Sequence, residues 1–153
     1  RPPRSTLFPY TTLFRSLIPQ EFHHLKYIGR LDANSEGLLL LTNSTEFKSY
    51  IENPYNNIEK IYKIRCFGSI SDKDLERLKQ PITIDNITYN FKDIKLIKQS
   101  INSWYQIILT EGKNREIRKV FEHINCPVSR IIRTSVDRYQ LGDIAVNSLI
   151  KVQ

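Results

Sequence analysis

The chain has 153 residues, 40% hydrophobic and 25% charged, which is typical of one soluble domain with its own core. It has no apolar run long enough to span a membrane and no recognisable signal peptide, and its two cysteines lie outside any zinc-binding spacing. These features predict a protein of the reducing cytoplasm without a metal site. A net charge of +7 and a pI of about 9.5 favour nucleic acid as partner over an anionic membrane surface.

Residues 1–16, RPPRSTLFPYTTLFRS, differ in composition from everything that follows. They repeat the triplet TLF, contain no acidic residue, and show no convincing amphipathic period. We interpret them as a non-native segment and assign the folded domain to residues 17–153.

The first predicted elements follow in chain order. Residues 37–43, GLLLLTN, are a short apolar run between Gly and Asn, which predicts a buried strand. Residues 43–54 predict a short helix capped by Asn43 or Ser44 and ended by Pro54. Its apolar face would contain Phe47, Tyr50 and Ile51. Residues 59–68, EKIYKIRCFG, alternate as expected for a half-buried strand.

The middle of the chain predicts a helix followed by two pairs of strands. Residues 71–81 begin with Ser71 and Asp74 in capping-box spacing, which indicates a two-turn helix. Residues 82–90 predict a hairpin that turns at Asp85-Asn86. Residues 91–100 and 103–112 predict a second strand pair.

The pattern then changes to a helical period over residues 114–124, NREIRKVFEHI. Its apolar stripe would be Ile117, Val120, Phe121 and Ile124. Residues 128–144 return to strand character. Because strands and helices do not alternate regularly, we predict an α+β fold with a mixed, mostly antiparallel central sheet and a few packed helices.

Two stretches could carry chemistry. TEGKNREIRK is not a phosphate-binding P-loop, because Lys113 precedes Asn114 and no glycine stands five residues before Gly112. A turn before a basic helix remains, and its amides with Lys113 and Arg115 could hold a phosphodiester. The helix taken alone favours the simpler interpretation of a solvated face. Asp32 in GRLDANSEGLLLL could begin a turn or be a reactive carboxylate at the mouth of a cleft, and its position alone favours the turn.

Four segments together favour a catalytic role for Asp32 over a simple turn. They are GRLDANSEGLLLLTN, EKIYKIRCFG, LTEGKNREIRKVFEHINCPVSRIIR and LGDI. In this order they resemble the pseudouridine synthases that modify single sites of small- or large-subunit ribosomal RNA, over about residues 17–153. Members of that family usually begin this domain with a strand containing Asn-Lys-Pro, often after a small RNA-binding domain. Neither feature is recognisable ahead of GRLD here.

The resemblance implies roles for particular residues. Asp32 would be the catalytic aspartate, Tyr62 would stack on the target base, and Arg118 would pair with Asp32. Arg30 would contact RNA around the space left by the flipped nucleotide. The remaining predicted RNA contacts are Lys113, Asn114, Arg115 and Arg133.

The resemblance also implies an isomerase that acts on a uridine of ribosomal RNA, as a monomer and without a cofactor, because pseudouridylation involves no redox step. It leaves open whether Asp32 attacks the ribose, attacks the base or acts as a general base. The alternative is a non-catalytic RNA-binding fragment of the same fold.

Overall fold

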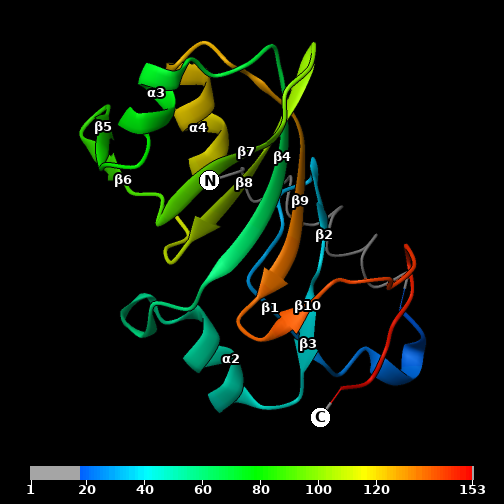
Figure 1. Cartoon of the computed structure of the whole chain (residues 1–153). Helices are drawn as coiled ribbons and strands as arrows, with labels where there is room; N and C mark the ends of the chain where they lie inside the picture. The colour runs from blue at the N-terminus through cyan, green and yellow to red at the C-terminus, as the bar shows by residue number, and fades with distance from the viewer. Residues whose placement is uncertain (1–17, 153) are drawn as a thin grey trace.

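The computed structural model describes residues 18–152, so the segment 1–16 lies outside the described residues. Its centre is a six-stranded sheet in the order β10-β9-β4-β8-β7, with β2 added beside β9 (Figure 1). The strands are β2 Ser35–Gly37, β4 Lys60–Phe67, β7 Asp93–Lys98, β8 Asn102–Leu109, β9 Val128–Val136 and β10 Tyr139–Gln140. Only the β2–β9 pairing is parallel among these strands. The predicted α+β fold with a mixed, mostly antiparallel sheet is confirmed.

The main core lies on one side of this sheet, because the long strands alternate buried and accessible residues. In β8 the buried positions are Ser103, Tyr105, Ile107 and Leu109, and in β4 they are Ile64 and Cys66. Helix α4, Glu116–His123, covers these side chains with Ile117, Val120 and Phe121. The predicted strands over residues 59–68 and 91–112 and the predicted helical stripe are therefore confirmed, with Ile124 capping the helix.

Helix α3, Asp72–Arg77, and the hairpin of β5, Ile82–Ile84, and β6, Ile87–Tyr89, complete the upper part of Figure 1. The Ser71 side chain accepts a hydrogen bond from the Asp74 N–H, as the capping-box prediction requires. Asp85 and Asn86 have φ angles of 51° and 66°, the pair of left-handed conformations that a tight hairpin turn needs.

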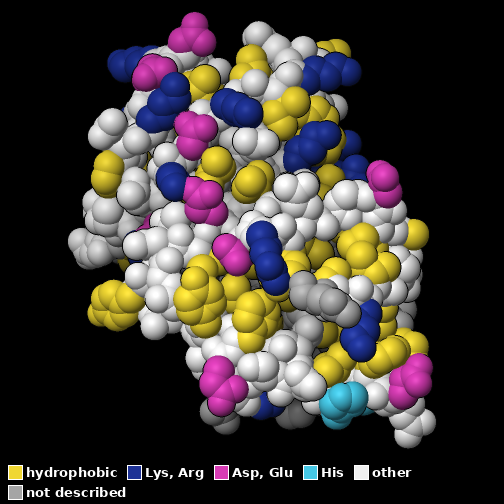
Figure 2. All heavy atoms as spheres, turned by 60° about the horizontal axis from the view of Figure 1, so that its bottom comes forward, with side chains coloured by type: hydrophobic (Ala, Val, Ile, Leu, Met, Phe, Trp, Pro, Cys, Tyr) yellow, Lys and Arg dark blue, Asp and Glu magenta, His cyan; other side chains and the backbone are white. Residues whose placement is uncertain are grey.

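A second, smaller core lies below, where β1, Lys26–Ile28, pairs with β3, Leu40–Thr42, beside helix α2, Thr45–Glu52. It contains Ile28, Leu38, Ile51, Ile58 and Val136. Short 3₁₀ turns occupy Gln20–Phe22 and Pro54–Asn56. Ser44 caps α2, but Tyr50 is 52% exposed instead of facing the core as predicted. Figure 2, in which this end comes forward, shows apolar side chains gathered over it.

The prediction of one buried strand over residues 37–43 is wrong. Gly37 ends β2, β3 begins only at Leu40, and Leu38 is the one fully buried leucine of the run. The cause is the close approach of β2 to β9: a Cβ at Gly37, whose φ is 112°, would meet the Arg133 carbonyl oxygen at 2.2 Å. The chain leaves β9 after the Leu38 N–H has bonded to that same carbonyl at 2.8 Å and pairs with β1 instead.

Within residues 18–152, no helix is long and apolar enough to cross a membrane.

Candidate active site

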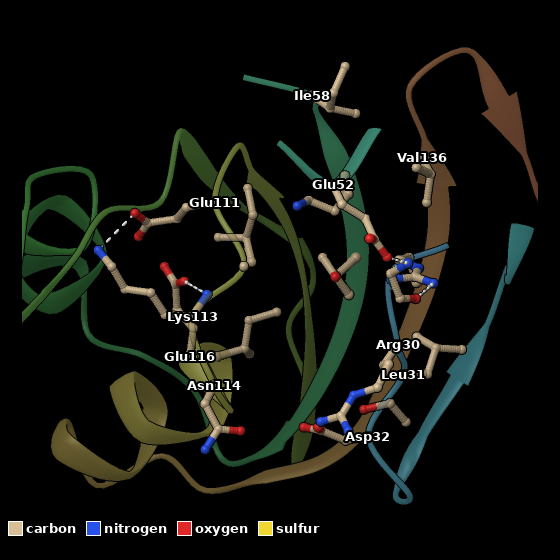
Figure 3. Close-up of a pocket in the computed structure, with 18 of the residues that line it drawn as sticks. Arg30, Leu31, Asp32, Glu52, Ile58, Glu111, Lys113, Asn114, Glu116 and Val136 are labelled. Atoms are coloured by element: carbon tan, nitrogen blue, oxygen red, sulfur yellow. Dashed lines mark hydrogen bonds and ion pairs between the residues drawn. The ribbon is translucent and has the colours of Figure 1, made fainter. Parts of the chain in front are cut away.

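A cleft of about 390 Å³ opens between the two cores. The loop from β1 to β2 forms one side, and we call residues 29–35 the aspartate wall. The loop from β8 into α4 forms the other, and we call residues 110–116 the lysine wall. Figure 3 shows Arg30 and Asp32 on one side of β4, and Lys113 and Asn114 on the other.

Asp32 stands at the start of a turn and also faces the cleft. The Ser35 N–H donates to the Asp32 carbonyl at 2.9 Å, and the Asp32 side chain is 27% exposed among the cleft-lining residues. The structure therefore has both the predicted turn and the predicted position at a cleft, while the reactivity of the carboxylate stays a prediction. The turn is what presents the carboxylate to the cleft.

Gly29 anchors the other end of the aspartate wall. Its N–H donates to the Glu52 carboxylate at 2.9 Å, and its carbonyl accepts from Arg133 Nη2 at 2.9 Å. Its φ of 62° is the left-handed conformation that lets both groups point to these partners. Burial alone would raise the pKa of Glu52, but hydrogen bonds from Gly29 and Lys48 lower it below its ordinary value. Glu52 therefore binds Gly29 as an ionised carboxylate.

Arg133 lines the cleft but is almost completely buried. It is only 2% exposed, and its Nε–H donates to the Leu38 carbonyl at 2.9 Å while Nη2 donates to Gly29. Its predicted RNA contact stays a prediction, and in the structure its guanidinium ties β9 to the aspartate wall. Sequence alone placed Arg133 in a basic cluster because its internal partners lie about a hundred residues earlier in the chain.

The two arginines of NREIRK also differ from the prediction. Arg115 Nη1 lies 3.9 Å from Asp32 Oδ2, whereas Arg118 Nη2 donates to the Asn34 carbonyl at 2.8 Å. Among the described residues, the expected Arg118–Asp32 ion pair is absent and Arg115 takes its place. The physical reason is local: Arg115 caps α4 with φ 50° and ψ 35°, so it leaves the helical pattern and turns toward Asp32.

Arg118 nevertheless lines the cleft beside this pair. Burial lowers its pKa, and the charge of Arg115 lowers it further, while Asp32 and Glu122 act in the opposite sense. Its buried Nε–H has no hydrogen-bond partner within residues 18–152. A buried guanidinium donor of this kind is costly unless a ligand or a rearranged carboxylate accepts its bond.

Tyr62, Arg30 and Asn114 all line the cleft, as the predicted base-stacking and RNA-contact roles require of their positions. Tyr62 is half-buried on β4, between Ile107 of β8 and Arg133 of β9. Arg30 and Asn114 are exposed on opposite walls. Their roles remain predictions.

Lys113 is also exposed at the cleft but is not free to reach far. Its ammonium binds the Thr88 carbonyl and lies 2.9 Å from Glu111 Oε2. The lysine wall is thus tied to the β5–β6 hairpin through the side chain predicted to contact RNA.

Sequence reasoning missed a pair of carboxyl groups in the lysine wall. Glu116 is 3% exposed, and its Oε1 accepts from the Lys113 N–H at 3.2 Å. Burial, followed by its hydrogen bond to Glu111, raises the pKa of Glu116 to about 8. Burial would also raise the pKa of Glu111, but hydrogen bonds to Glu116, Lys113 and the Asn90 N–H lower it. At neutral pH Glu116 therefore keeps its proton, whereas Glu111 is ionised.

Lys60 joins this cluster from the start of β4. Burial lowers its pKa, Arg133 lowers it further, and Glu116 and Glu111 counteract both effects. A signal for Glu116 exists in the sequence, since it stands one turn before Val120 and beside Ile117 on the buried side of the helix. Within the described part of the chain, no group of three or more His, Cys, Asp or Glu side chains could hold a metal ion.

Comparison with known proteins places this arrangement in a family context. The sequence profile of RNA pseudouridylate synthase matches residues 9–123. An "Uncharacterized RNA pseudouridine synthase" of Rickettsia bellii is 44% identical over 126 residues, which cover 82% of this chain and 55% of that protein. "Ribosomal large subunit pseudouridine synthase B" of Haemophilus influenzae is 40% identical over 107 residues, covering 69% and 30%.

Solved structures agree on the fold. A structure titled "Crystal structure of pseudouridylate synthase" superposes with a TM-score of 0.73 at 20% identity, covering 82% of this chain and 55% of that one. An H/ACA RNP bound to a substrate RNA containing 2′-deoxyuridine gives a TM-score of 0.63 at 12% identity, covering 88% and 44%. The chain spans about half the length of the Rickettsia relative and of the pseudouridylate synthase structure. It spans 30% of the Haemophilus relative.

Proposed function

The chain belongs to the RNA pseudouridylate synthase family, and we propose that it converts a uridine of ribosomal RNA to pseudouridine with Asp32 as the catalytic carboxylate. The observation that carries the proposal is Asp32 itself, paired with an arginine at the mouth of a cleft that Tyr62 also lines. Ribosomal RNA is the proposed substrate because relatives at about 40% identity are named for the large ribosomal subunit. A cytoplasmic, monomeric enzyme is part of the same proposal.

The reaction needs an exposed base. Flipping a uridine out of a stack costs a few kcal/mol and is cheapest in unpaired RNA. Stacking of the base on an aromatic ring such as Tyr62 returns roughly 1–3 kcal/mol. Arg30, exposed on the aspartate wall, is suited to a phosphate or to the gap left by the flipped nucleotide.

The chemistry itself rearranges bonds without a net change in composition. The bond from ribose C1′ to uracil N1 breaks, the base turns, and C1′ bonds to C5. The proton lost from C5 is balanced by the proton gained at N1. An ionised Asp32 serves each of the three mechanisms, as nucleophile at the ribose, nucleophile at the base or general base.

Arg118 is proposed to support Asp32 in the complex. Its buried Nε–H, which has no partner within residues 18–152, would donate a hydrogen bond to a nucleotide or to the Asp32 carboxylate once RNA fills the cleft. The planar guanidinium would then orient the carboxylate as well as supply charge.

The test is the replacement Asp32→Asn, which keeps the shape of the side chain and removes its charge. We expect pseudouridine formation in ribosomal RNA transcripts, mapped by chemical sequencing, to disappear while RNA affinity stays within about twofold. Asp137→Asn is the matched control, because Asp137 is exposed in a left-handed turn that asparagine adopts readily. Turnover near that of the unaltered chain in Asp32→Asn would overturn the catalytic assignment. RNA binding with no turnover by the unaltered chain would favour the non-catalytic RNA-binding alternative.

A further inference from the structure

The central sheet has a second side that helices α3 and α4 do not cover. The inner side carries Ile64 and Cys66 of β4 in the main core, where α4 packs. Because side chains alternate along a strand, Lys63 and Arg65 of β4 point to the opposite side. We call the set Lys63, Arg65, Lys95, Lys98, Trp104 and Arg130 the outer face.

Strand register places these side chains in two rows across the sheet. In the first row, Arg65 stands opposite Arg130 of β9 on one side and Trp104 of β8 on the other, with Lys98 of β7 beyond. In the second row, Lys63 of β4 stands opposite Gln106 of β8, and Gln106 stands opposite Lys95 of β7. Neighbouring strands lie about 4.7–4.9 Å apart, so the cations are closely spaced.

Two arginines directly opposite each other in a sheet repel, which makes the Arg65–Arg130 pair a cost to folding. Part of this cost is offset locally. Arg130 makes a two-pronged bond to Glu36, with both N···O distances 2.8 Å, and Arg65 Nε donates to the Ser129 hydroxyl at 2.9 Å. The Arg130 hydrogen bond and the charges of Arg130 and Arg65 hold the pKa of Glu36 below its ordinary value, although burial opposes them.

Trp104 orders two of these cations, Lys63 and Arg65. Lys63 Nζ lies 4.9 Å and the Arg65 guanidinium 5.7 Å from the centroid of its ring. Contacts of this kind hold long side chains against a flat surface and so lower the entropy lost when a ligand binds them. The acidic side chains at this surface are Glu36, already paired with Arg130, and Asp93, one row further along β7. Positive charge therefore remains in excess over the outer face.

We propose that the outer face binds the phosphodiester backbone of single-stranded RNA, as a second contact surface outside the cleft. Ordered cations around an aromatic ring on an open sheet match the chemistry of single-strand binding. Strand β2 connects the two surfaces: Ser35 lines the cleft, whereas the next residue, Glu36, reaches Arg130 on the outer face. RNA crossing the β2 edge would contact both. The inference rests on the proposed function only in taking RNA as the partner.

The test removes two charges from the outer face in the variant Lys63→Gln/Arg65→Gln. Lys73→Gln/Arg77→Gln is the matched control, which removes the same two residue types from exposed positions of α3. Both pairs are made in the full chain carrying Asp32→Asn, so turnover plays no part, and thermal unfolding checks that each variant folds. The probe is a fluorescently labelled single-stranded RNA, titrated over a range of salt concentrations.

We expect the log–log salt slope to become shallower by about 1.4 in the outer-face variant, because each phosphate that is no longer neutralised reduces the slope by about 0.7. The control should keep a slope closer to that of the parent, and a trinucleotide that fills only the cleft should bind both variants alike. Equal slopes in the outer-face and control variants would overturn the proposal. So would loss of poly-glutamate binding with unchanged RNA affinity, which would assign the surface to an acidic protein. Absence of pseudouridine formation by the unaltered chain would overturn the proposed function and leave this result standing.

Discussion

The aspartate wall is fixed largely by groups whose charge does not change near neutral pH, whereas the lysine wall is fixed in part by Glu116, whose pKa is raised to about 8. On the first, Arg133 bonds to the carbonyls of Gly29 and Leu38, and ionised Glu52 holds the Gly29 N–H. On the second, Glu116 accepts a hydrogen bond from the Lys113 N–H and keeps its proton at neutral pH. The proposed reactive carboxylate therefore stands on the wall that pH disturbs least, and the predicted RNA contacts Lys113, Asn114 and Arg115 stand on the wall that pH can loosen.

The largest effect is expected from Arg133→Met, which keeps much of the volume and removes both hydrogen bonds. A buried carbonyl at Leu38 and a partly buried one at Gly29 would lose their partner, so the free energy of unfolding should fall by about 3 kcal/mol, at roughly 1–3 kcal/mol for each unsatisfied group. Chemical denaturation measures this change. The control is Arg77→Met at an exposed position of α3, expected within about 0.5 kcal/mol. A similar small loss in both variants would mean that Arg133 does not hold the aspartate wall.

Arg118→Lys should reduce activity without a comparable loss of stability. Lysine keeps the charge but cannot bond to Asn34 and offer a second, planar donor toward Asp32 or the nucleotide. We expect kcat/KM for pseudouridine formation to fall at least about tenfold, which corresponds to about 1.4 kcal/mol of transition-state stabilisation. Lys119→Arg, at the next position, is the control for changing a cation type on this helix. Full activity in Arg118→Lys would show that charge alone is needed at position 118.

Glu116→Gln tests the pH dependence of the lysine wall. In the folded chain the pKa of Glu116 is about 8, above its ordinary value of 4.5. As pH rises, Glu116 therefore loses its proton at a lower pH in the unfolded chain than in the folded chain. The contribution of Glu116 to stability is full below about pH 4.5 and is lost as pH rises toward 8. Glutamine resembles the protonated form, so the variant should lose this decline and gain about 1 kcal/mol at alkaline pH, the size of one relieved buried group.

Unfolding measured from pH 5 to pH 9 gives the comparison. Glu122→Gln, exposed on the same helix, should keep the decline of the unaltered chain. An identical decline in Glu116→Gln would place the titrating group elsewhere.

The sequence predicted those features of the fold that depend on interactions between residues close together in the chain. Alternation in β4 and β8, the Ser71 cap and the Asp85-Asn86 turn involve near neighbours, and each was predicted correctly. The division of GLLLLTN was not, because it depends on the approach of Gly37 to Arg133, about a hundred residues away.

The candidate site follows the same rule. Motifs identified Asp32, Tyr62 and both arginines as candidates, and all of them line one cleft. Which arginine faces Asp32 depended on a left-handed conformation at Arg115 that an uninterrupted helical pattern does not predict. Burial of Glu116 required only the helical period and could have been predicted from it.

The smallest effect is expected from Arg115→Lys, although Arg115 is the residue paired with Asp32. The distance of 3.9 Å is long for a hydrogen bond, and the two side chains are 42% and 27% exposed, so the pair contributes charge more than geometry. Lysine supplies the same charge, and kcat/KM should stay within about twofold, with the energetic change inside the 0–1 kcal/mol range of exposed pairs. Arg115→Gln separates charge from shape, because it keeps a polar side chain and should lower activity more than lysine does. A loss in Arg115→Lys as large as that in Arg118→Lys would show that position 115 needs a guanidinium, and the orienting role would then belong to Arg115.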